Sequence, residues 1–160
     1  MRAITIRQPW AELIVRGEKD VENRSWRTRH RGPLLIHAGG QADRKRFGEH
    51  GVPDDVQLGA IIGVVEVVDC TQEKTSAWHE EGSWGWYLAR PRRFKKPIPM
   101  KGQRGLFEVL ERKVAAQLGS TGRKRGSRRR RAPKSRTGAE RRSARRPGAS
   151  SNLSDPRGPP

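Results

Sequence analysis

Residues 59–70 read GAIIGVVEVVDC, an apolar run rich in β-branched residues. Its length and its valine and isoleucine content predict a buried β-strand rather than a helix. Gly59 and Gly63 interrupt the run, and glycine inside a strand often marks a bend or a bulge. Closed barrels require such bends, so this stretch favours a curved sheet.

Other short segments of the chain also have the pattern of strands. Residues 2–6 alternate, which places Ile4 and Ile6 on one face. The remaining candidates are apolar or alternating and follow one another after short connections: residues 21–26, 33–38, 84–91 and 105–111. A helix should follow the first strand, because Pro9 suits the first helical position and Gly17 is placed to end the helix. The expected fold is α+β, a small barrel of five or six mostly antiparallel strands with flanking helices.

Charge divides the 160-residue chain into two unequal parts. Residues 1–118 carry 21 Lys and Arg against 15 Asp and Glu, a net +6, whereas residues 119–160 carry 14 against 2, a net +12. The second part has almost no apolar residues and abundant Gly, Ser, Pro and Arg, so burial cannot offset its ordering entropy. We therefore expect one domain over residues 1–112 and a disordered, arginine-rich tail over residues 113–160.

The excess of positive charge predicts a polyanionic partner, RNA or DNA, whose phosphates the tail would bind without reading sequence. The alternative for the tail is an unselected low-complexity extension. Cys70 is the only cysteine and cannot form an internal disulfide, which fits a reducing, cytoplasmic location. The sequence predicts no metal or other cofactor, no signal peptide, no membrane span and a monomer.

Four blocks in this order resemble the ASCH domain, the activating-signal-cointegrator homology module of the PUA-like superfamily. They are IRQPWAELIVRGEKDVENRSW, HRGPLLIHA, GAIIGVVEVVDC and WYLARPRRFKKPIPMKGQRGLFEV, and together they span most of residues 1–112. The first block contains the family's G-x-K-x-x-E element as Gly17, Lys19 and Glu22. The resemblance implies a PUA-like β-barrel with a cleft in which the lysine and the glutamate meet.

Two functions follow from the resemblance. Relatives in the superfamily bind RNA or DNA, often around a modified base. Some bacterial ASCH proteins resemble hydrolases that deacylate a modified cytidine with a lysine, a threonine three residues later and a downstream glutamate. Glu22 occupies the position of that threonine here, which is a departure from the hydrolase pattern. Nucleic-acid binding is therefore the first hypothesis, and an amidohydrolase that uses Lys19 and Glu22 is the alternative. A protein-interaction module is a third possibility.

Lys19 and Glu22 have a physical interpretation of their own. A lysine at the rim of a cleft can hold a phosphate or donate to a base carbonyl. If burial lowered its pKa it would become a general base, whereas pairing with Glu22 would keep it protonated, and we expect the pairing to dominate. Glu22 can accept from the exocyclic amino group of cytosine. An exposed ion pair without function is the alternative for both residues.

Aromatic and basic residues near this element complete the expected site. Trp10 is expected in the core, while Trp26, Trp84 and Trp86 lie near basic residues and are candidates for base stacking. Two basic runs, residues 24–31 and 90–96, would form a phosphate track if they border one cleft. The expected nucleic-acid-binding set is Gln8, Lys19, Glu22, Arg24, Trp26, Arg29, Arg31, Arg92 and Arg93. Glu66, Glu80 and Glu81 are possible second carboxylates and are left unassigned.

Overall fold

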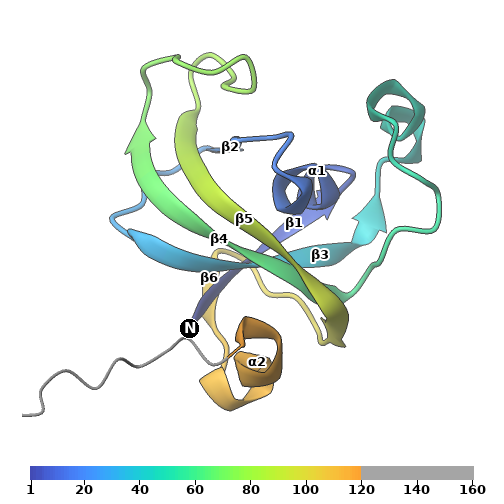
Figure 1. The fold of residues 1–160 in the computed structure, drawn as a ribbon. Helices are drawn as coiled ribbons and strands as arrows, with labels where there is room; N and C mark the ends of the chain where they lie inside the picture. The colour runs from blue at the N-terminus through green and yellow to red at the C-terminus, as the bar shows by residue number, and fades with distance from the viewer. Residues whose placement is uncertain (120–160) are drawn as a thin grey trace, which may run out of the picture. The chain divides into compact units, whose positions relative to one another are not determined.

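The described part of the chain is residues 1–119 of this computed structural model (Figure 1). Its elements in chain order are β1 (Arg2–Gln8), α1 (Trp10–Arg16), β2 (Val21–Arg24), β3 (Gly32–Ala42), the 3-10 turns η1 (Arg44–Arg46) and η2 (Gly48–His50), β4 (Ala60–Thr71), β5 (Trp84–Pro99), β6 (Leu106–Glu108) and α2 (Glu111–Leu118). Most of the predicted tail, residues 120–160, lies outside the described residues. No helix within residues 1–119 is long and apolar enough to cross a membrane.

The six strands form one mixed sheet in the order β2-β5-β4-β3-β1-β6. Only β1 and β3 pair in parallel, and the other four pairings are antiparallel. The prediction of five or six mostly antiparallel strands with flanking helices is therefore confirmed. The prediction of a barrel is not, because the edge strands β2 and β6 are four and three residues long and do not pair with each other. Local sequence patterns predict where strands form, but they do not predict whether the two edge strands of a sheet pair with each other.

The strand predicted from residues 59–70 is β4, and its glycine has the expected effect. The register between β4 and β5 shifts between Ile61 and Gly63. A Cβ on Gly63 would lie 2.6 Å from the carbonyl oxygen of Arg92 and 2.7 Å from Cγ1 of Val15. Glycine is therefore required where helix α1 and strand β5 both approach β4 closely.

The two helices cover opposite faces of the sheet (Figure 1). Ile14 and Val15 of α1 pack in one cluster with Ile4 and Ile6 of β1, which confirms that these isoleucines share a face. Val114 of α2 is fully buried in the cluster on the other face. Helix α2 thus carries the described fold six residues beyond the boundary expected at residue 112.

Candidate functional site

The position of Lys19 is set by the end of helix α1. Gly17 ends the helix with a φ of +81°, as the sequence predicts, and the backbone N–H of Lys19 still donates to the carbonyl of Leu13 at 3.1 Å. One residue later, the carbonyl of Asp20 accepts from Leu88 of β5 at 2.7 Å. These bonds hold the loop at both ends, and the Lys19 side chain is only 6% exposed.

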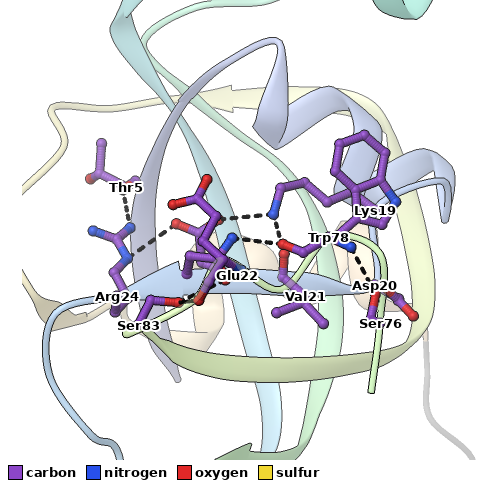
Figure 2. A network of polar contacts seen from close by, with 11 residues as sticks. Thr5, Lys19, Asp20, Val21, Glu22, Arg24, Ser76, Trp78 and Ser83 are labelled. Carbon is purple, nitrogen blue, oxygen red and sulfur yellow. Dashed lines mark hydrogen bonds and ion pairs between the residues drawn. The ribbon is translucent and has the colours of Figure 1, made fainter. Parts of the chain in front are cut away.

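Glu22 lies on β2 opposite Trp86 of β5 and connects Lys19 to Arg24. Its Oε2 is 4.0 Å from Lys19 Nζ, and its Oε1 is 3.1 Å from Arg24 Nε. Lys19 Nζ also donates to the carbonyl of Val21. Figure 2 shows the row of polar groups that results, with Glu22 between the two cations. The structure therefore places the predicted lysine and glutamate side by side.

Arg24 connects this row to β1, which lies near the opposite edge of the strand order. Its Nη2 donates to the carbonyl oxygen of Thr5 on β1 at 2.9 Å (Figure 2). The edge strand β2 is thus tied to β1 through a side chain rather than through a backbone ladder. Arg24 is a structural link as well as a neighbour of Glu22.

Burial shifts the pKa values of Lys19 and Glu22 in opposite directions. Desolvation lowers the pKa of Lys19 below its ordinary value, and the negative charge of Glu22 opposes this. Desolvation raises the pKa of Glu22, against the attraction of Arg24 and Lys19. The neutral forms of both groups are therefore closer in free energy to the charged forms than they are in water. Burial is thus the larger effect on the pKa of Lys19, and the expectation that Lys19 stays protonated beside Glu22 remains a prediction.

Trp78 and Trp10 form an aromatic wall beside Lys19, and a residue of β2 fixes the position of Trp78. The Nδ2 of Asn23 donates to the carbonyl of Trp78 at 2.8 Å, and its Oδ1 accepts from the backbone N–H of Glu80 at 3.1 Å. These bonds fix the β4–β5 loop so that Lys19 Nζ lies 5.6 Å from the centroid of the Trp78 ring. The Trp10 ring is edge-on to Trp78 at 6.1 Å.

Lys19 and Glu22 line a pocket of about 500 Å³ between β2, the start of α1, the η1–η2 turns and the β4–β5 loop. Its lining combines aromatic, cationic, carboxylate and amide groups: Trp10, Lys19, Glu22, Asn23, Asp43, Arg46, His50, Ala77, Trp78 and Glu80. Sequence reasoning missed most of these residues, because they come from turns without a strand or helix pattern. Trp10, expected in the core, is partly buried and also lines the pocket. Within residues 1–119, no three His, Cys, Asp or Glu side chains are placed to hold a metal ion.

Several residues expected in the site lie away from this pocket. Gln8 is fully buried, and its side chain bonds the backbone of Gln57 and Glu12 at 3.0 and 2.9 Å. Trp86 is also fully buried, so it cannot stack on a ligand. Trp26 is 37% exposed, but it stands edge-on to Trp86 rather than at the pocket.

Trp84 and the predicted arginines are also distributed over other surfaces. Trp84 is partly buried and faces Arg27 at 5.4 Å. Arg29 is exposed, and Arg31 pairs with Asp69 at 3.1 Å.

The second basic run faces both sides of the sheet. Arg93 pairs with the buried Glu12 of α1, whereas Arg92 donates to the carbonyl of Leu118 in α2. The two runs meet at a separate groove of about 820 Å³, which His30, Arg90 and Arg92 help to line. The predicted phosphate track therefore does not border the Lys19–Glu22 pocket.

The three carboxylates that the sequence left unassigned, Glu66, Glu80 and Glu81, lie at different places in the structure. Glu80 lines the pocket, and its negative charge acts on both Lys19 and Glu22. Glu81 is exposed and does not line the pocket, and Glu66 pairs with Arg90 at the other groove. Of these three glutamates, only Glu80 therefore belongs to the Lys19–Glu22 pocket.

Comparison with known proteins gives the family directly. The model of the ASCH domain matches residues 4–98, which include α1, the Lys19 loop and β2. The chain belongs to the ASCH domain family. The matched residues include Gly17, Lys19 and Glu22, which form the helix stop, the buried lysine and the buried glutamate of this ASCH domain.

Two similar proteins are much longer than this chain. Activating signal cointegrator 1 from Mus musculus is 30% identical over 126 residues, which cover 66% of this chain and 22% of that protein. The protein of the same name from Homo sapiens is 38% identical over 84 residues, which cover 44% of this chain and 14% of that protein. This chain therefore spans less than a quarter of the relatives that it matches.

A solved ASCH structure has the same fold. A variant of the ASCH protein from Zymomonas mobilis superposes with a TM-score of 0.50 and 14% sequence identity. The match covers 71% of this chain and 92% of that one. At this level of identity the likeness concerns the fold alone.

Proposed function

We propose that this ASCH domain binds nucleic acid, RNA in the first place, and takes one unpaired base into the Lys19–Glu22 pocket. The observation that carries the proposal is the buried pair itself, a donor and an acceptor 4.0 Å apart that line one pocket beneath Trp78. A lysine can donate to a base carbonyl, and a carboxylate can accept from an exocyclic amino group. The volume of about 500 Å³ lies in the usual range of small-molecule pockets.

The charges of the pocket support a base rather than a phosphate as the inserted group. Three carboxylates, of Glu22, Asp43 and Glu80, line it against the cations of Lys19 and Arg46. A phosphate would meet net repulsion there, whereas an amino group would find acceptors. This balance is opposite to the strong positive charge of the chain as a whole.

The aromatic wall supports the same proposal. RNA-binding domains commonly stack unpaired bases on aromatic side chains, which tolerate any base. Trp10 and Trp78 both line the pocket, so a base that enters it lies against at least one indole ring. Stacking would supply affinity, and Lys19 with Glu22 would supply the preference for one base edge. The basic residues 119–160 would add affinity for phosphates that does not depend on sequence.

A binding experiment with the full chain tests this function. We expect fluorescein-labelled oligocytidylate to bind more tightly than oligouridylate, because only cytosine offers an amino group to the carboxylates. Trp78→Ala should weaken both about tenfold through lost stacking. Glu22→Gln and Glu80→Gln should reduce the preference for cytosine, while the matched variant Glu81→Gln should keep it. Equal affinity of the wild type and Trp78→Ala for both oligonucleotides would contradict a base-reading pocket.

The lowered pKa of Lys19 favours a second candidate, an amidohydrolase acting on an acylated cytidine. A desolvated lysine is more readily deprotonated and can act as a base or a nucleophile. Incubation of the protein with N4-acetylcytidine should then release acetate, and Lys19→Ala should abolish the release with the fold intact. No acetate at high protein concentration would eliminate this substrate and leave the binding function.

A further inference from the structure

We infer that the groove between helix α2 and the β4–β5 part of the sheet is a second nucleic-acid site, which holds the sugar–phosphate backbone of a single strand. This inference rests on the proposed function and adds a surface to it. The groove has a volume of about 820 Å³ and is larger than the Lys19–Glu22 pocket. It lies between the β4–β5 part of the sheet and the ends of α2, and its lining includes the apolar residues Pro33, Val64, Val65 and Pro91 and the basic residues Arg2, His30, Arg90 and Arg92.

The charge of the groove is opposite to that of the pocket. Three arginines line it against the carboxylates of Glu66 and Glu111, and Arg2 also lies 3.6 Å from Glu108. Arg90 pairs with Glu66, but Arg92 donates to a backbone carbonyl, so no carboxylate neutralises it in the described structure. The groove therefore favours an anionic group and the pocket favours a base edge, as two parts of one nucleotide strand require.

A β-bulge at Arg90 places its side chain at the groove. Strand β5 has two residues, Arg90 and Pro91, where β4 has only Val65 between the paired positions. Arg90 adopts a φ of +50°, which is uncommon for any residue but glycine. Bulges and strained non-glycine residues occur often at functional sites, where they direct a side chain. The Arg90 side chain is held at the groove at the expense of local strain.

The same bulge lies between the groove and the pocket. Pro91 lines the groove, and a Cβ on Gly17 would lie 3.0 Å from its Cγ. Lys19, Gly17, Val65 and Pro91 also share a small cavity of about 40 Å³. The two sites are therefore neighbours across the Gly17–Lys19 loop.

The order of the sequence adds a further argument for a polyanion. Leu118 lines the groove, and it is followed directly by residues 119–160, with 14 Lys and Arg against 2 Asp and Glu. The chain thus passes from a positively rimmed groove into its most basic stretch. A long acidic polymer matches both features, whereas a short ligand matches only the first.

The salt dependence of binding by the full chain tests the groove. The probe is a fluorescein-labelled oligouridylate, titrated at several salt concentrations. The double variant Arg90→Gly/Arg92→Ala should make the negative slope of log K against log salt shallower by about 1.4, because each lost phosphate contact on a single strand removes about 0.7 from its magnitude. Glycine tolerates the positive φ at position 90, so Arg90→Gly alone keeps the bulge if the double variant is poorly folded.

The matched control is Arg7→Ala/Lys74→Ala, which removes the same charge from exposed positions outside both sites. If the double groove variant behaves like this control, the groove is not a nucleic-acid site. An acidic protein segment would then be the alternative occupant of the groove. The proposed function would still stand if Trp78→Ala weakened binding. The opposite result, a groove effect without a Trp78 effect, would overturn the base pocket and support the groove. No oligonucleotide binding by the wild type would overturn both.

Discussion

Lys19 and Glu22 are the residues at which burial and charge compete most directly. Each is nearly buried, and each has an oppositely charged neighbour within 4.0 Å. A surface pair with this spacing would contribute under about 1 kcal/mol and keep ordinary pKa values. Here desolvation is the larger effect on both groups. The chemistry of the pocket therefore depends on its depth rather than on the two residue types alone.

The carboxylate of Glu22 should measurably support the charge of Lys19. Glu22→Gln removes this attraction, so the pKa of Lys19 should fall further below its ordinary value. NMR titration of the lysine side chains measures this directly, with Glu81→Gln as the control, because Glu81 is not among the charges that act on Lys19. An unchanged Lys19 pKa in Glu22→Gln would show that the two groups do not interact.

The same shift determines the sign of a stability effect. Because the pKa of Lys19 is lowered in the folded state, the unfolded chain binds this proton more tightly. The free energy of unfolding should therefore rise with pH from the lowered pKa up to the ordinary value of 10.5. Lys19→Met should lose this alkaline rise in urea midpoints measured across that range. Parallel profiles for the wild type and the variant would contradict the shift.

Strand β4 shows how one position limits a whole element. Gly63 lies where Val15 of α1 and the carbonyl of Arg92 on β5 approach the strand most closely. Successive residues of β4 point to opposite faces of the sheet, Val65 into the cluster that includes α1 and Val64 into the cluster that includes α2. The position of α1, and with it the Lys19 loop, depends on this approach.

Gly63→Ala should therefore destabilise the protein by about 1–3 kcal/mol, since one of the added contacts is with backbone that cannot move freely. Gly40→Ala in β3 is the matched control: nothing lies within 4 Å of its added Cβ, and the cost should stay within about 0.5 kcal/mol. Urea denaturation of the two variants measures both values. Equal midpoints would show that α1 can shift away from β4.

At the scale of the molecule, α2 belongs with the folded part of the chain. Val114 is fully buried against the face of the sheet opposite α1, and Leu118 packs on the same cluster. The backbone of Lys96 in β5 also donates to the side chain of Gln117 at 3.2 Å. Residues 113–118 therefore contribute to stability rather than only to charge.

A chain that ends at residue 112 should accordingly be less stable than one that ends at residue 119. The loss should be about 2 kcal/mol or more, because the shorter chain exposes the surface that Val114 covers. Thermal and urea midpoints of the two truncated proteins test this. If both chains unfold at the same midpoint, α2 does not stabilise the sheet.

The local elements of this ASCH domain are predictable from short stretches of its sequence. The strand over residues 59–70, the helix that ends at Gly17 and the bulge at Gly63 all follow from neighbouring residues. Alternating or apolar runs, proline and glycine act over one or two turns of chain, so their effects are readable without knowledge of the fold. The family motif also identified Lys19 and Glu22, which the structure places in one pocket.

The residues that accompany this pair in the pocket follow from contacts between distant segments, which appear only in the folded chain. Trp78 reaches the pocket because Asn23, 55 residues earlier, bonds its backbone, while Trp86 is buried and Trp26 lies elsewhere. The failure of the sheet to close has the same origin, since β2 and β6 meet other strands but not each other. Contacts between distant segments depend on how loops return and how edges align, and no local pattern encodes them.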